Sequence, residues 1–183
     1  LVTNQEYKSE LTLPAKIFEL TSLQSIPIRM ISNQNLNYKF GIPLLHLTKH
    51  LKSIKILPIM IGELTAKEII NFSLIIKDII IASDKRIGIV TSGNLSQTLT
   101  SNSHAGFVKE GKEFDEKFIE LITNKNLPGL LQMNENLKTK SEQNIFNQSA
   151  LLLGILQNIN CNFEMLSYDD SFGVGYLTSD FII

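Results

Sequence analysis

The stretch that decides the fold is IKILPIMIGELTAKEIINFSLIIKDIIIASDKRIGIVTSGNLSQ, residues 54–97. Residues 54–61 are apolar at nearly every position, which is typical of a strand covered on both faces. Thr65 and Glu68 match a T-x-x-E capping box, so we expect a long helix with a buried face to begin there. Residues 86–91 form a second apolar run. A strand, a helix and a strand in this order predict a right-handed parallel crossover.

The rest of the chain continues this alternation of helices and strands on both sides of the crossover. The periodicity predicts helices over 8–23, 43–52, 113–124 and 141–158, and strands over 25–31, 163–168 and 173–181. We therefore expect one α/β domain over residues 1–183, with a mainly parallel central sheet flanked by helices.

Composition limits the classes of function. The chain has 183 residues, of which 43% are hydrophobic, and its formal net charge is −1. A charge this close to zero provides no field to attract nucleic acid, and no apolar run of about 18 residues predicts a membrane span. The single cysteine, Cys161, cannot form an internal disulfide, which favours a reducing compartment. These features predict a cytoplasmic protein that binds neither nucleic acid nor membrane.

Ligands of open α/β sheets bind beyond the carboxyl ends of the strands, where this chain has turns over 32–40 and 92–97. His46 and His50 lie four residues apart on a predicted helix, a spacing at which two imidazoles can share a metal ion. No H-E-x-x-H motif supplies further metal chemistry, so we interpret both histidines as structural. Asp169 and Asp170 are adjacent and therefore point to opposite sides, which favours a turn over an acid–base pair.

Four segments, in order along the chain, carry a resemblance to a known family. They are LNYK at 36–39 with IPL at 42–44, ILPI at 56–59, TSGNLSQ at 91–97 with EGKEFD at 110–115, and FGVGYL at 172–177 after Tyr168. These segments resemble L-D-H-G with V-P-L, V-P-I, S-G-D-L-S-H with E-G-x-x-F-D, and Y-x-x-x-F-G-V-G-Y-L. Together they resemble the B subunit (LigB type) of class III extradiol ring-cleavage dioxygenases, and in particular its Memo-like branch.

This resemblance implies an α/β fold whose pocket holds non-haem Fe(II) and a catechol-like substrate. Two histidines and one carboxylate bind the metal in such sites and leave positions open for substrate and oxygen. The resemblance also implies that the first strands of the family's domain, with one ligand histidine, precede the segment that begins at Leu1. Residues 1–183 would then be the greater, C-terminal part of a LigB/Memo-like domain.

The chain departs from the family pattern at the positions that carry its chemistry. The metal-ligand histidine is replaced by Tyr38 and the aspartate before it by Asn37. The acid/base histidine is replaced by Gln97 and its aspartate by Asn94, and the ligand glutamate corresponds to Gln143. An amide is a weak metal ligand, a phenol must lose a proton with a pKa near 10 to coordinate, and Gln97 cannot exchange a proton near neutral pH. We therefore assign no catalytic residue, and we predict that the chain binds neither a metal nor a cofactor.

Our leading interpretation is a non-catalytic binding or interaction protein that keeps the family fold and takes a small aromatic ligand. Its former pocket is expected to be lined by Asn37, Tyr38, Ser92, Asn94, Gln97 and Gln143. The polar replacements keep hydrogen bonds in the pocket and remove charge that no metal would neutralise.

Two alternatives remain open. The chain could be an active Fe(II) dioxygenase that uses Glu142 with His46 or His50 and a histidine from a missing segment or a partner chain. It could also be a structural subunit that completes a partner's fold. An unpaired apolar sheet edge favours pairing with another chain, so we expect a homo-oligomer or a protein partner.

Overall fold

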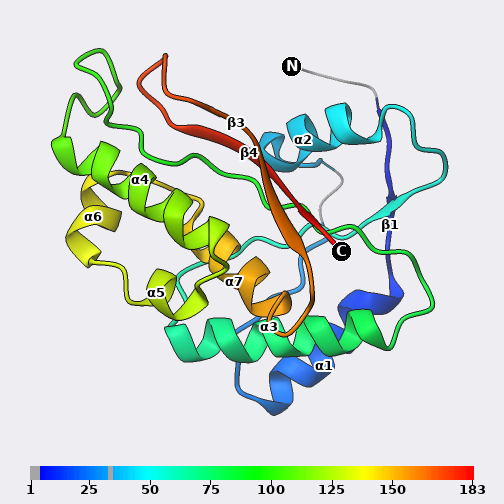
Figure 1. The fold of residues 1–183 in the computed structure, drawn as a ribbon. Coiled ribbons are helices and arrows are strands. Elements are labelled where there is room, and N and C mark those ends of the chain that lie inside the picture. The colour runs from blue at the N-terminus through cyan, green and yellow to red at the C-terminus, as the bar shows by residue number, and fades with distance from the viewer. Residues whose placement is uncertain (1–4, 33–34) are drawn as a thin grey trace.

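The computed structural model describes residues 5–32 and 35–183, so part of the turn predicted over 32–40 lies outside the described residues. Short strands and seven helices follow one another in the described chain (Figure 1). The order is β1 (Lys8–Ser9), α1 (Thr12–Leu23), α2 (Tyr38–Thr48), β2 (Lys55–Ile56), α3 (Ala66–Ile81), α4 (Lys109–Thr123), α5 (Leu127–Leu131), α6 (Glu135–Lys140), α7 (Phe146–Ile155), β3 (Asn162–Asp169) and β4 (Tyr176–Ile182). The fold therefore mixes helices with small strands.

The predicted capping box at the start of α3 is confirmed. The Thr65 side chain accepts a hydrogen bond from the Glu68 backbone N–H, and the Glu68 carboxylate accepts one from the Thr65 backbone N–H at 2.7 Å. These bonds satisfy two of the donors that a helix N-terminus leaves free. The helix buries Ile69, Phe72 and Ile76 along one face, as its spacing predicts.

The mainly parallel central sheet is not found among the described residues. Within them, β1 pairs in parallel with β2 over two residues, and β3 pairs with β4 in an antiparallel hairpin. The strands predicted over 25–31 and 86–91 are extended segments outside any sheet, and only Lys55–Ile56 of the run 54–61 is paired.

The physical reason lies in how these apolar runs are covered. Leu57, Ile59 and Ile61 pack against the helices, whereas Met60 between them is 71% exposed, so the run is covered on one face and not on both. Pro58, and Pro27 in the earlier segment, lack the backbone N–H that a sheet ladder needs. The apolar sequence alone did not show whether such a run is covered on one face or on both.

Three predicted helices have different bounds. The helix predicted over 43–52 is α2, which begins at Asn37 as N-cap and contains Pro43 inside. The helix predicted over 141–158 is α7, which begins only at Phe146 and ends at Ile155, because the chain turns at Glu142, whose φ is +51°. The short helix α6 ends at Lys140, before the predicted range. The helix predicted over 8–23 begins only at Thr12.

Two buried clusters form the core. One joins Leu95 to α4, α5 and α7 and includes Phe114, Phe118 and Leu130. The other packs α1 against α3. Figure 1 shows α3 in the lower part of the view, next to α1 and α7. The first cluster includes Leu95 and Phe114, which stand in the quoted motifs TSGNLSQ and EGKEFD. None of the described helices has both the length and the apolar composition needed to cross a membrane.

Candidate functional site

The turn after the apolar run 86–91 is bonded to the segment between α6 and α7. The Gln97 backbone N–H donates to the Ser141 carbonyl at 2.8 Å. The Asn94 backbone N–H donates to Asn144 Oδ1 at 2.7 Å, and the Asn144 backbone N–H donates to the Asn94 carbonyl at 3.1 Å. We call residues 92–98 and 141–146 the loop pair. The fold thus brings together two segments about 45 residues apart that the sequence analysis singled out separately.

Two predicted pocket side chains tie this loop pair. Gln97 Nε2 donates to the Glu142 carbonyl. Gln143 Oε1 accepts the backbone N–H groups of Ile145 at 3.0 Å and Phe146 at 2.9 Å, which supplies α7 with the acceptor that its N-terminus needs. Asn94, Gln97 and Gln143 therefore all lie in the loop pair, and the amide side chains of Gln97 and Gln143 bond to backbone groups. That these three side chains line a ligand pocket stays a prediction.

The buried carboxylate of Asp115 is bonded to the loop pair, and the sequence analysis did not assign this residue a role. Asp115 on α4 is 1% exposed. Its Oδ1 accepts the Ser96 backbone N–H at 2.7 Å, and its Oδ2 accepts the Tyr168 hydroxyl at 2.8 Å. Asp115 and Tyr168 both stand in the quoted motifs, EGKEFD and the run that begins at Tyr168, so this signal was present in the sequence.

The same carboxylate fits closely against the last motif. A Cβ at Gly175 would overlap Asp115 Oδ2, so only glycine fits there without a shift. The Gly175 backbone makes two hydrogen bonds to the turn next to this contact. Its N–H donates to the Ser96 carbonyl at 2.8 Å, and its carbonyl accepts the Leu95 N–H at 3.0 Å. Three motifs thus meet at one buried group.

Burial changes the ionisation of this pair. Loss of solvent is the main cause that raises the pKa of Asp115 from its ordinary 3.8 to about 6, against the lowering effect of the bonds from Ser96 and Tyr168. Burial and the adjacent carboxylate also raise the pKa of Tyr168, so this hydroxyl remains a donor at neutral pH.

The remaining predicted pocket residues lie elsewhere or have no bond to the site. Asn37 is the N-cap of α2, where its Oδ1 accepts the Lys39 N–H at 2.9 Å, and Tyr38 is 68% exposed on the first turn. Within residues 5–32 and 35–183, no hydrogen bond joins either of them to the loop pair, and Ser92 is half-buried at the beginning of the loop pair.

The alternative ligand set is exposed and dispersed. His46 and His50 lie on and just after α2, and Glu142 lies in the loop pair. All three are exposed, and no group of three or more His, Cys, Asp or Glu residues that could hold a metal ion occurs in the described part of the chain.

The donor groups at the family positions do not fit the Fe(II) that the resemblance implies. Fe(II) in such sites takes imidazole nitrogen and carboxylate oxygen. Here the corresponding ligand positions hold the phenol of Tyr38 and the amide of Gln143, whose Oε1 already accepts two backbone N–H groups. These residues therefore do not make an Fe(II) site of the family type.

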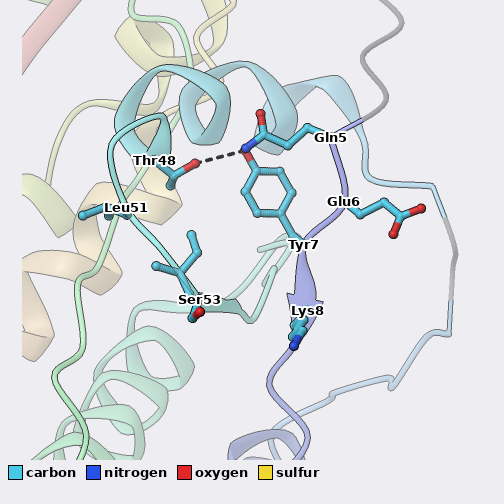
Figure 2. A pocket seen from close by; sticks show the side chains of 8 residues that line it. Gln5, Glu6, Tyr7, Lys8, Thr48, Leu51 and Ser53 are labelled. Carbon is cyan, nitrogen blue, oxygen red and sulfur yellow. Dashed lines mark hydrogen bonds between the residues drawn. The ribbon is translucent and has the colours of Figure 1, made fainter.

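Two hollows of the described surface lie away from the loop pair. The first measures about 260 Å³ and lies between the segment around β1 and the end of α2 (Figure 2). Within it the Tyr7 hydroxyl donates to Thr48 Oγ1 at 3.1 Å, since the Thr48 hydroxyl proton is used on the Leu44 carbonyl at 2.6 Å. The second measures about 460 Å³ and lies between α3 and α5. Neither is lined by Asn94, Gln97 or Gln143.

Comparison with known proteins gives two findings. The family model described as the catalytic LigB subunit of aromatic ring-opening dioxygenase matches residues 2–178. Protein CA_C1420 of Clostridium acetobutylicum is 26% identical over 182 residues, which covers 94% of this chain and 39% of that protein. The chain thus spans about two fifths of the length of this relative.

Proposed function

The chain belongs to the LigB family of aromatic ring-opening dioxygenase subunits, and we propose that this member is a binding protein without ring-cleavage activity. The observation that carries the proposal is how the amide side chains of Gln97 and Gln143 are used. Gln97 donates to the Glu142 carbonyl, and Gln143 accepts two backbone N–H groups at the start of α7. Both amides thus bond to the backbone where the family places an acid/base group and a metal ligand, respectively. Amides at these positions support binding and not proton transfer.

The ligand class that we propose is a small aromatic molecule with adjacent hydroxyl groups, by analogy with the family's substrates. Its binding site would be the loop pair, whose two bonded segments carry the polar side chains of Asn94, Gln97 and Gln143. A catechol hydroxyl can both donate to and accept from such amides.

Calorimetric titration of the protein with catechol tests this function. We expect saturable binding by the native protein and at least fivefold weaker binding by Asn94→Ala, whose backbone bonds to Asn144 do not depend on its side chain. Asp78→Asn, an exposed substitution on α3, is the matched control and should bind as the native protein does. Equal binding by Asn94→Ala would contradict the assignment of the site.

A second candidate is the active Fe(II) dioxygenase of the family, which the family membership itself favours. Measurement of metal in protein grown with iron, followed by oxygen uptake with catechol, separates the two. Stoichiometric iron together with catechol-dependent oxygen uptake would overturn the non-catalytic proposal. An active enzyme would need ligands such as His46, His50 or Glu142 to be completed by another segment or chain.

A third candidate is a subunit that pairs with a second copy or another protein. Exposed apolar residues on the extended segments favour it, with Ile31 72%, Met60 71% and Val90 57% exposed. We propose that the segment 86–91, which contains no proline, becomes a strand of a mainly parallel sheet in that assembly. Light scattering that gives a monomer at micromolar concentration would count against it. We propose the cytoplasm as its location, since Cys161 is unpaired and buried.

A further inference from the structure

Three separate stretches of the chain converge on the carboxylate of Asp115. Ser96 from the loop pair donates its backbone N–H to Oδ1, and Tyr168 from β3 donates its hydroxyl to Oδ2. Gly175, before β4, packs against Oδ2 and is bonded through its backbone to Ser96. The carboxylate therefore joins α4, the β3–β4 hairpin and the loop pair at a single point.

Residues 92–98, the turn of the loop pair, are held by backbone bonds to Ser141, Asn144 and Gly175. Thr98 Oγ1 also donates to the Lys140 carbonyl at the end of α6 at 3.3 Å. Ser96 Oγ and Thr98 Oγ1 are bonded to each other at 3.1 Å, and the Thr98 N–H donates to Ser96 Oγ at 3.2 Å. These last two bonds lie within the turn and do not tie it to a helix. Asp115 is the side chain through which the turn is attached to the buried face of α4.

We propose that Asp115 is the positioning residue of the candidate site, and that its carboxylate, oriented by the Tyr168 hydroxyl, holds the turn so that Asn94 and Gln97 face Gln143. This proposal rests on the proposed function only in taking the loop pair as the ligand-binding site. The attachment itself is a property of the free protein. When the Ser96 bond opens, water reaches Asp115 and the loop pair loosens.

The attachment depends on pH because burial raises the pKa of Asp115, and the titratable groups around it are acidic. They are Tyr168 from β3, Asp170 from the turn after β3 and, next to Tyr168, Glu116 from α4. The buried carboxylate has a pKa of about 6 in the closed arrangement and returns towards its ordinary 3.8 when the turn opens. The closed state therefore binds the proton more tightly, so the closed state gains when the pH falls and loses when the pH rises through about 6.

Exchange of the Ser96 backbone amide, followed by NMR at pH 5 and pH 7.5, tests the proposal without any ligand. After correction for the intrinsic pH dependence of exchange, the linkage predicts roughly tenfold stronger protection of the Ser96 amide at pH 5 than at pH 7.5. Asp115→Asn should abolish this difference, because an amide can still accept from Ser96 but does not titrate. The exposed Asp78→Asn variant should keep it.

Two further variants distinguish positioning from general stability. Tyr168→Phe removes a donor that favours the ionised carboxylate, so the midpoint of the pH dependence should move above about 6. Asp115→Ala removes the acceptor, and the Ser96 amide should lose at least tenfold protection at both pH values. If Asp115→Ala does not fold, Asp115→Asn and Tyr168→Phe still decide the matter.

The outcomes separate this proposal from the proposed function. The positioning role is overturned if the corrected protection of the Ser96 amide in the native protein is equal at both pH values. It is also overturned if Asp115→Asn keeps the pH dependence. Catechol binding is then decided by its own titration. If exchange behaves as expected but the protein does not bind catechol, the positioning role is supported and the proposed ligand class is wrong.

Discussion

Substitution of Asp115 by asparagine should change how the stability of this protein depends on pH. The carboxylate is 1% exposed and has a pKa of about 6 in the folded chain, whereas in the unfolded chain it has its ordinary pKa of 3.8. The folded state therefore holds the proton more tightly than the unfolded state between these two values. The stability from this group is fully present below pH 3.8 and is lost as the pH rises through about 6.

The size of the effect follows from the two pKa values. Each tenfold change in an ionisation equilibrium corresponds to about 1.4 kcal/mol, so raising the pH from below 3.8 to above 6 costs the folded state about 3 kcal/mol at this residue. The asparagine side chain of the variant resembles the neutral acid and does not lose this amount. Because the unfolded carboxyl is already more than half ionised at pH 4, the free energy of unfolding of Asp115→Asn minus that of the native protein should rise by about 2 kcal/mol from pH 4 to pH 7.5.

Urea unfolding, followed by circular dichroism at a series of pH values, provides the assay. Taking the difference between the two proteins at each pH cancels the other titrating groups, and an equal denaturant dependence in both confirms that the unfolded states are comparable. A difference that stays constant within about 1 kcal/mol across this pH range would refute the reasoning, because it would mean that Asp115 is ionised as easily in the folded chain as in the unfolded chain.

Three further predictions concern the elements around the site. Thr65→Ala should remove the capping box of α3 and lower the free energy of unfolding by about 1 kcal/mol, measured by urea unfolding with the exposed Lys67→Ala substitution as control. Gly175→Ala should cost about 1–3 kcal/mol, because its Cβ would overlap Asp115 Oδ2, and a neutral result in thermal unfolding would contradict this packing. Gln143→Ala should lower stability by about 1 kcal/mol through the lost acceptor at the start of α7, without changing the metal content measured by elemental analysis.

Local patterns in the sequence predicted local structure well. Thr65 and Glu68 are three residues apart, and the capping box that they predicted is formed because its bonds lie within one helical turn. The two final strands were also predicted, as β3 and β4, because a hairpin pairs segments that are near neighbours in the chain. The family motifs indicated that Asn94, Gln97 and Gln143 belong together, and the loop pair joins them.

The sequence by itself determined which family the chain resembles and which polar groups stand at the positions of its chemistry, because residue identity and short spacing are written directly in the chain. Only the tertiary structure decided that the runs 25–31 and 86–91 remain outside a sheet, since pairing depends on what lies beside a strand. It also decided that Asp115 is buried with Tyr168 and Ser96, because residues 19 and 53 positions away meet it only after folding, and the loss of water there raises its pKa.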